Sequence, residues 1–195
     1  MGFNKYFTFG LRREWLESFL EGGFEWFCGC SLGPYQKKAL LNYLKDAWII
    51  DADDFTDIGE YIAKLMKKDK ETAWQAVWVN LCLNSDLFRW YVNTVKWGET
   101  FTKEKLVRKL TREGIKQRTA QNAINSLINT FETSPLGEWF GKRLGKKTCI
   151  KEGLETVNKE LVWYMSNILM VMDEDLAHKF LGISKEEFLR LSALM

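Results

Sequence analysis

The chain has 195 residues, of which 46% are hydrophobic and 14% aromatic, including nine Trp and thirteen Phe. This apolar and aromatic content supports a packed interior in one sizeable domain or two small ones, and it excludes a disordered chain. The formal net charge of +2 is too small to predict any partner by itself.

Residues 1–70 are predicted to form a winged-helix-like subdomain. Residues 3–10 alternate in polarity and indicate a short strand, and residues 11–21 carry one apolar face that indicates a helix ending at a pair of glycines. A second helix is expected to begin at Pro34, and a third near Thr56, with a short extended piece and an acidic turn between them. Helix, hairpin and helix in this order are typical of a winged helix.

Residues 71–100 are predicted to be an aromatic-rich helical connector. Two helices are expected here, separated by a break near Asn84-Ser85-Asp86. Trp74 and Trp78 repeat at helical spacing, which could in principle describe a ligand cage. Such a stripe is far more often part of a hydrophobic core, so we expect both side chains to be buried.

Residues 101–150 are predicted to form a second helix-turn-helix-like subdomain. Residues 102–112 indicate a first helix, Gly114 breaks it, and residues 117–130 indicate a second helix. The second helix has an unusually regular apolar stripe at three- and four-residue steps. The residues of that stripe are Ala120, Ala123, Ile124, Leu127, Ile128 and Phe131.

The polar side of this second helix carries Arg118, Gln121, Asn122, Asn125 and Asn129. Solvated helix faces usually carry Glu and Lys, and Asn is a poorer helix former. Asn, Gln and Arg are the side chains that form paired hydrogen bonds with adenine and guanine edges. In a helix-turn-helix, the second helix lies in the major groove.

Positive charge is concentrated in the same region. Between Phe101 and Lys147 there are eleven Lys or Arg against four Glu, so the rest of the chain is net negative. The last basic group, residues 142–147, is expected to act as a wing along phosphates. The predicted nucleic-acid-binding residues are Arg108, Lys109, Lys116, Arg118, Gln121, Asn122, Asn125, Asn129, Lys142, Arg143, Lys146 and Lys147. Helix pairs with polar outer faces also occur in proteins that never meet DNA, and many winged helices serve only as protein-interaction modules.

Residues 151–195 are predicted to form C-terminal helices. The stretch 161–172 is apolar on nearly every side, which is typical of a central helix or of a contact in a homo-oligomer. Ser184 and Glu187 form a capping box that opens a short final helix. The longest aliphatic run, 168–172, is far shorter than the ~20 residues that span a bilayer. We therefore expect no membrane partner and a cytoplasmic location.

The sequence contains no complete pattern for catalysis or for a cofactor or metal ion. The single histidine, His178, lacks an evident nucleophile nearby. Cys28-Gly29-Cys30 has one intervening residue rather than two to four, and no second pair follows. The acidic turn 51–57 lacks the spacing of a calcium loop. We expect no catalytic residues, cofactor or metal site.

Several segments resemble a domain of unknown function that accompanies phosphoadenosine-phosphosulfate-reductase-like (PAPS-reductase-like) proteins. The segments are Phe7-Thr8-Phe9-Gly10-Leu11-Arg12 to Trp15-Leu16, Leu32-Gly33-Pro34-Tyr35-Gln36, Ala39-Leu40, Leu44-Lys45-Asp46-Ala47, Ile49-Ile50 and Thr133-Ser134-Pro135-Leu136-Gly137. The resemblance implies a helical, winged-helix-like fold and an accessory role beside a reductase-like partner or fused domain. It transfers no catalytic residues, because the partner's Ser-Gly-Gly nucleotide loop is absent from this sequence.

Three functions follow as hypotheses. The first is a non-enzymatic accessory or regulatory module whose second subdomain contacts DNA. The second is a protein-interaction domain that docks a sulfur- or nucleotide-handling enzyme through Trp-rich and apolar helical surfaces. The third, an enzyme with an unrecognised carboxylate site, has no feature of the sequence in its favour.

Overall fold

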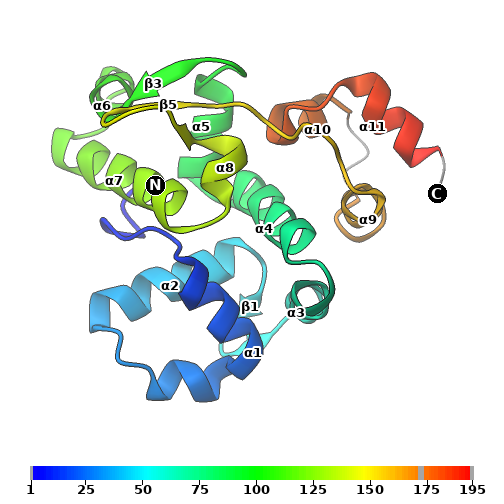
Figure 1. Cartoon of the computed structure of the whole chain (residues 1–195). Coiled ribbons are helices and arrows are strands. Elements are labelled where there is room, and N and C mark those ends of the chain that lie inside the picture. The colour runs from blue at the N-terminus through cyan, green and yellow to red at the C-terminus, as the bar shows by residue number, and fades with distance from the viewer. Residues whose placement is uncertain (1, 171–173, 194–195) are drawn as a thin grey trace.

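The computed structural model describes residues 2–170 and 174–193, and the predicted mainly helical fold is confirmed. The N-terminal part, at the bottom of Figure 1, consists of three helices and a hairpin. They are α1 (Arg13–Gly29), α2 (Pro34–Asp46), β1 (Ile50–Asp51), β2 (Asp54–Phe55) and α3 (Asp57–Lys68). The hairpin lies between α2 and α3, as the sequence predicted. Thr56 caps α3 by accepting a hydrogen bond from the N–H of Gly59 at 2.9 Å.

Two details of this part differ from the prediction. No strand forms over residues 3–10, which instead make consecutive turns with Phe7 at a positive φ of 56°. The backbone there hydrogen-bonds within its own turns, as when the N–H of Phe7 donates to the carbonyl of Asn4 at 3.1 Å, and to side chains, as when Asn42 donates to the carbonyl of Lys5 at 2.6 Å. Helix α1 also does not end at the glycine pair. It continues to Gly29 through a kink at Gly23, whose φ of 57° is a conformation that glycine adopts without steric cost.

Helices α4 (Lys70–Asn84) and α5 (Asp86–Thr94) form the centre of the molecule (Figure 1). They are separated at Ser85, within the predicted break. All residues of α4 from Thr72 to Cys82 are buried, and the helix contacts α2, α3, α8, α9 and α10. Trp74 and Trp78 are core side chains, as predicted. The segment expected to connect two subdomains is therefore the helix around which both are packed.

The predicted helix pair of the second half is confirmed as α6 (Lys103–Arg112) and α7 (Gln117–Thr133), joined through Gly114 at a φ of 88°. The pair is followed by α8 (Leu136–Phe140). Strands β3 (Thr100–Thr102), β4 (Lys142–Arg143) and β5 (Thr148–Ile150) form an antiparallel sheet in the order β3-β5-β4. The basic stretch 142–147 thus forms one strand and the turn of the β4–β5 hairpin.

The C-terminal part contains α9 (Lys159–Trp163), a π-helical turn η1 (Tyr164–Ile168), α10 (Glu174–Leu181) and α11 (Lys185–Ser192). Ser184 accepts a hydrogen bond from the N–H of Glu187 at 3.1 Å, which confirms the N-cap half of the predicted capping box. The apolar stretch 161–172, predicted as one central helix, buries Leu161, Tyr164 and Met165 but leaves Trp163 and Met170 exposed, and its helical part ends at Ile168. Residues 171 and 172 lie outside the described part. Among the described residues, no helix combines the length and apolar character needed to cross a membrane.

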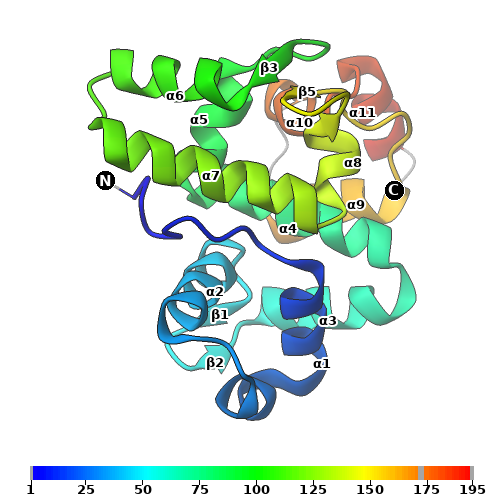
Figure 2. The same ribbon diagram turned by 60° about the vertical axis from the view of Figure 1, so that its left-hand side comes forward.

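The N-terminal segment, residues 2–11, ties the two halves of the molecule together. It runs along one side of α7 and then enters α1 (Figure 2). The N–H of Leu11 donates to the hydroxyl of Thr130 at 3.0 Å, and the buried Tyr6 hydroxyl donates to Ser85 at 2.8 Å. One hydrophobic cluster extends from Tyr6 to Leu191. The segment is thus an integral part of the core.

Replacement of Gly10 by Ala is expected to destabilise this junction. A Cβ atom at position 10 would lie 2.2 Å from the backbone nitrogen of Thr130, which belongs to a packed helix and cannot easily move. Overpacking of this kind costs about 1–3 kcal/mol in the free energy of unfolding, measurable by denaturant titration. Gly29→Ala is the matched control, since no atom lies within 4 Å of its added Cβ. Equal stability of the two variants would contradict the close approach.

Candidate nucleic-acid interface

Helix α7 presents three different sides to its surroundings. Its apolar stripe faces the core as predicted except at Ile128, which is half-buried and lines a cavity on the outward side. A second side faces the N-terminal segment. The buried apolar residues of the helix are Ala120, Ala123, Ile124, Leu127 and Phe131. Only the third side points outward, and its composition decides what the helix can bind.

Two of the predicted polar residues are held by the N-terminal segment. The side-chain amide of Asn122 donates to the side-chain oxygen of Asn4 at 3.1 Å. The amide of Asn129 donates to the backbone carbonyl of Thr8 at 2.7 Å. Both asparagines are half-buried. The polar face available to a ligand is therefore narrower than the sequence predicted.

Three other polar residues form an outward stripe on α7. Arg118 and Gln121 are exposed, and Asn125 is half-buried at the next position on the same side. Within the described part of the chain, these three side chains have no hydrogen bond or ion pair with another residue. Their donors and acceptors are free to meet an external ligand. We call these three residues the outward stripe.

The outward stripe leads into a cavity of about 230 Å³ between α7, the start of α6 and the β4–β5 hairpin. Its positively charged lining residues are Lys103, Arg143, Lys146 and Lys147, its carboxylates are Glu104 and Glu132, and its amide-bearing residues are Asn125 and Asn129, so cations outnumber carboxylates. Residues from both predicted groups, the helix face and the wing, thus meet in one place. We call this cavity the basic groove.

Some of the predicted cations are already paired with carboxylates. Arg143 forms an ion pair with Glu132 and donates to the backbone carbonyl of Lys146 at 2.6 Å, so it shapes the hairpin turn. Lys142 lies 2.9 Å from Glu152. Because both side chains are paired with carboxylates, they attract a negatively charged ligand less strongly than the sequence predicted.

Lys109 is also held by internal contacts. It lies 3.5 Å from Glu99 and donates to the backbone carbonyl of Thr94 at 3.1 Å. Burial alone would raise the pKa of Glu99, but hydrogen bonds from Lys105 and the Lys96 N–H, with the charge of Lys109, lower it to about 2. Lys109 therefore helps to hold α6 against the segment that contains Thr94 and Glu99.

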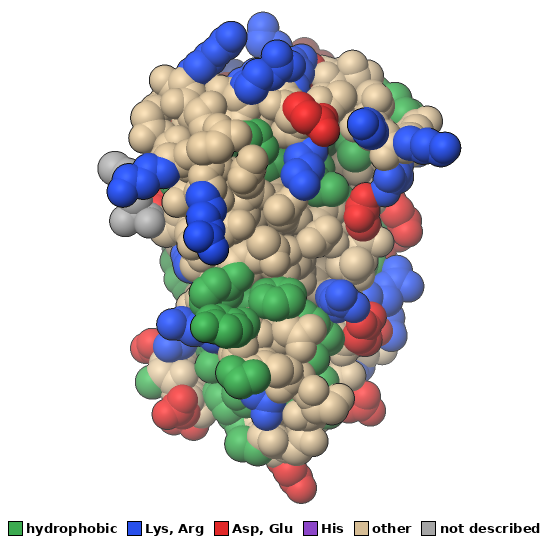
Figure 3. Space-filling view, turned by 90° about the vertical axis from the view of Figure 1, so that its left-hand side faces the viewer, with side chains coloured by type: hydrophobic (Ala, Val, Ile, Leu, Met, Phe, Trp, Pro, Cys, Tyr) green, Lys and Arg blue, Asp and Glu red, His purple; other side chains and the backbone are tan. Residues whose placement is uncertain are grey.

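The remaining predicted cations are exposed. Arg108, Lys116, Lys146 and Lys147 have no ion pair among the described residues. The face that carries α6 and α7 has more Lys and Arg than Asp and Glu in its upper part (Figure 3). Exposed cations without an ion pair are the groups that phosphates attract most strongly. Lys147 is the exception among the four in that its charge also acts on the nearby carboxylate of Glu104 and helps to lower its pKa.

No protein-family model, curated protein or solved structure matches this chain. A functional assignment therefore rests on the residues of the chain themselves.

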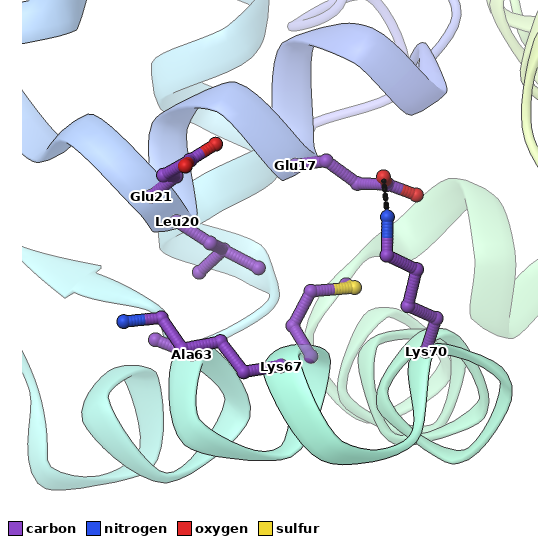
Figure 4. Close-up of a pocket in the computed structure, with 7 residues that line it drawn as sticks. Glu17, Leu20, Glu21, Ala63, Lys67 and Lys70 are labelled. Carbon is purple, nitrogen blue, oxygen red and sulfur yellow. Dashed lines mark hydrogen bonds and ion pairs between the residues drawn. The ribbon is translucent and has the colours of Figure 1, made fainter.

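A second cavity, of about 240 Å³, lies between α1 and the helices α3 and α4 (Figure 4). Glu17 on α1 and Lys70 on α4 point toward each other there, with their charged atoms 2.6 Å apart. Burial raises the pKa of Glu17, but hydrogen bonds from Lys70 and from the indole of Trp74 outweigh burial and lower it. These charged groups hold α1 to α4 and are not directed at a ligand.

Proposed function

We propose that this chain is a non-enzymatic accessory or regulatory module that binds duplex DNA through α7 and the β4–β5 hairpin. The observation that carries the proposal is the junction of the outward stripe with the basic groove. The outward stripe carries amide and guanidinium groups that can bond to base edges. The exposed cations of the basic groove lie beside it and can bind phosphates. The chain order of a strand, the helix pair α6–α7, the short helix α8 and a hairpin in one antiparallel sheet resembles that of a winged-helix domain, with α8 as an addition.

The accessory role rests on the resemblance to the domain that accompanies PAPS-reductase-like proteins. In this proposal, the module directs such an enzyme, fused or separate, to DNA. It needs no catalytic residue of its own, because its contribution is affinity for the duplex.

The proposal predicts salt-dependent DNA binding that depends on the basic groove. The variant Arg118→Ala/Lys146→Ala/Lys147→Ala should bind a labelled 25-base-pair duplex about 10- to 100-fold more weakly at low salt, because each neutralised phosphate releases counterions. The slope of log affinity against log salt should fall by about 0.9 for each phosphate that the variant no longer neutralises. Fluorescence anisotropy between 50 and 300 mM salt measures both quantities.

The matched control is Lys45→Ala/Lys64→Ala/Lys67→Ala, which removes the same charge from exposed positions in the N-terminal part. Its affinity and salt slope should match those of the unmodified chain. If both triple variants lose affinity equally, net charge rather than the groove governs binding. Undetectable or salt-insensitive binding by the unmodified chain would refute the proposal.

A protein-docking function is the second candidate, and an apolar surface favours it. Figure 3 shows hydrophobic side chains gathered on the N-terminal half of the same face. In that half of the chain, Tyr35 is 66% exposed, and its ring meets the ring of Phe7 edge-on at 5.2 Å. Exposed aromatic side chains are frequent anchors of protein interfaces. Tyr35→Ala should leave DNA affinity unchanged if the two surfaces act separately.

A further inference from the structure

We infer that α7 reads three consecutive base pairs with purines on one strand: guanine at Arg118 and adenine at Gln121 and Asn125. This inference rests on the proposed DNA binding and adds its sequence preference. It follows from which polar side chains the fold leaves free and from the hydrogen-bonding groups of those side chains.

Of the five polar residues predicted on α7, the fold leaves three available to contact bases. Asn122 and Asn129 donate their amide hydrogens to the N-terminal segment, at 3.1 and 2.7 Å. Each amide uses one of its two hydrogens in this contact, and the contact holds the side chain toward the N-terminal segment rather than toward an external base. In the described part of the chain, Arg118, Gln121 and Asn125 have no such partner.

The chemistry of the free groups specifies the bases. A guanidinium donates two parallel hydrogen bonds to N7 and O6 of guanine. A carboxamide accepts from N6 and donates to N7 of adenine, which no other base allows in the major groove. One guanidinium followed by two carboxamides therefore matches guanine followed by two adenines along the groove.

The spacing of the outward stripe suits adjacent base pairs. Arg118 and Asn125 are seven residues apart, which corresponds to about 10 Å along a helix. The first and third of three adjacent base pairs are about 7 Å apart along the duplex axis. Zinc-finger helices, which enter the groove at an angle, read three successive bases with a similar spread of residues. The next positions on this side are the apolar Ile128 and then Glu132, which pairs with Arg143. Asn125 is therefore the last residue of α7 that we expect to contact a base.

Cations lie at both ends of the stripe and can fix its register. Lys116 is exposed at the start of α7, and Lys146 and Lys147 line the basic groove beside Asn125. Phosphate contacts on both sides of a helix set its position in the groove, and the base edges opposite its side chains are then defined.

The test is selection of bound duplexes from a randomised pool by the full chain, followed by sequencing. The unmodified chain should enrich a G-A-A step. Arg118→Lys keeps the charge but lacks the planar fork, so it should keep salt-dependent binding and show a weaker preference for guanine, whereas Arg118→Ala should lose that preference. Gln121→Ala should lose the preference for the central adenine. Each loss should reduce discrimination at its own position by about 5- to 100-fold.

Asn122→Ala is the matched control, because it removes an amide from the same helix that the fold has already engaged. It should enrich the same step as the unmodified chain. Salt-dependent binding without any enriched step would overturn this inference and leave the proposed DNA binding intact. An enriched step that changes in Asn122→Ala but not in Gln121→Ala would overturn it as well. Failure to retain any duplex would overturn both proposals.

Discussion

Trp78→Ala is expected to lower the free energy of unfolding by about 3–5 kcal/mol, the usual cost of removing a large buried aromatic side chain. The Trp78 ring is fully buried and stacks on Phe140 at 4.1 Å. Its indole N–H donates to the backbone carbonyl of Phe180 at 2.7 Å, so one side chain holds α8 and α10 against α4. The variant would leave both a cavity and an unpaired carbonyl. Denaturant titration followed by circular dichroism gives the quantity directly.

Trp163→Ala is the control for the same change of residue at the surface. The Trp163 side chain is 41% exposed and touches the ring of Tyr61 at 5.9 Å. Its removal should cost about 1 kcal/mol or less. Similar losses in the two variants would contradict the central place of Trp78 in the core.

The stability of the protein is also expected to depend on the buried Lys151 at alkaline pH. Its ammonium group donates to the backbone carbonyls of Val92 and Val95 at 3.2 and 2.8 Å. It also lies 3.9 Å from the centre of the Trp97 ring. Burial disfavours its charged form and lowers its pKa from 10.5 to about 8, with Glu99 opposing this shift and Lys179 adding to it.

The sign of the effect follows from the two pKa values. Between pH 8 and 10.5 the unfolded chain keeps a proton on Lys151 that the folded chain has released. Raising the pH through this window therefore favours the folded state, and lowering it to pH 8 removes that stability. Each unit of pKa difference corresponds to about 1.4 kcal/mol, so the free energy of unfolding should rise by about 2 kcal/mol between pH 7.5 and 9.5.

Comparison with Lys151→Met isolates this contribution. The buried tyrosines titrate in both proteins, and burial raises the pKa of Tyr43 and Tyr164, among others, so that their effect cancels in the difference. The unfolding free energy of the unmodified chain minus that of the variant should increase from pH 7.5 to 9.5. A difference that stays constant over this range would mean that Lys151 is not buried as described.

Local patterns in the sequence correctly predicted the elements that form the interface. The apolar stripe of α7 and the break at Gly114 identified the helix pair, because helical periodicity is a property of neighbouring residues. The burial of Trp74 and Trp78 followed from the same kind of pattern. The strand expected at 3–10 was wrong, because alternation indicates a strand only where another strand can pair with it.

The sequence by itself therefore determined the helix pair α6–α7, its inward face and the region that holds the positive charge, but not the end of α1 or the short helix α8. Only the tertiary structure decided which polar groups stay available. Asn122 and Asn129 are engaged by residues near the N-terminus, and Arg143 and Lys142 are paired with Glu132 and Glu152. The physical reason is that periodicity reports one helix at a time. A hydrogen bond between segments far apart in the chain forms only when the core brings them together.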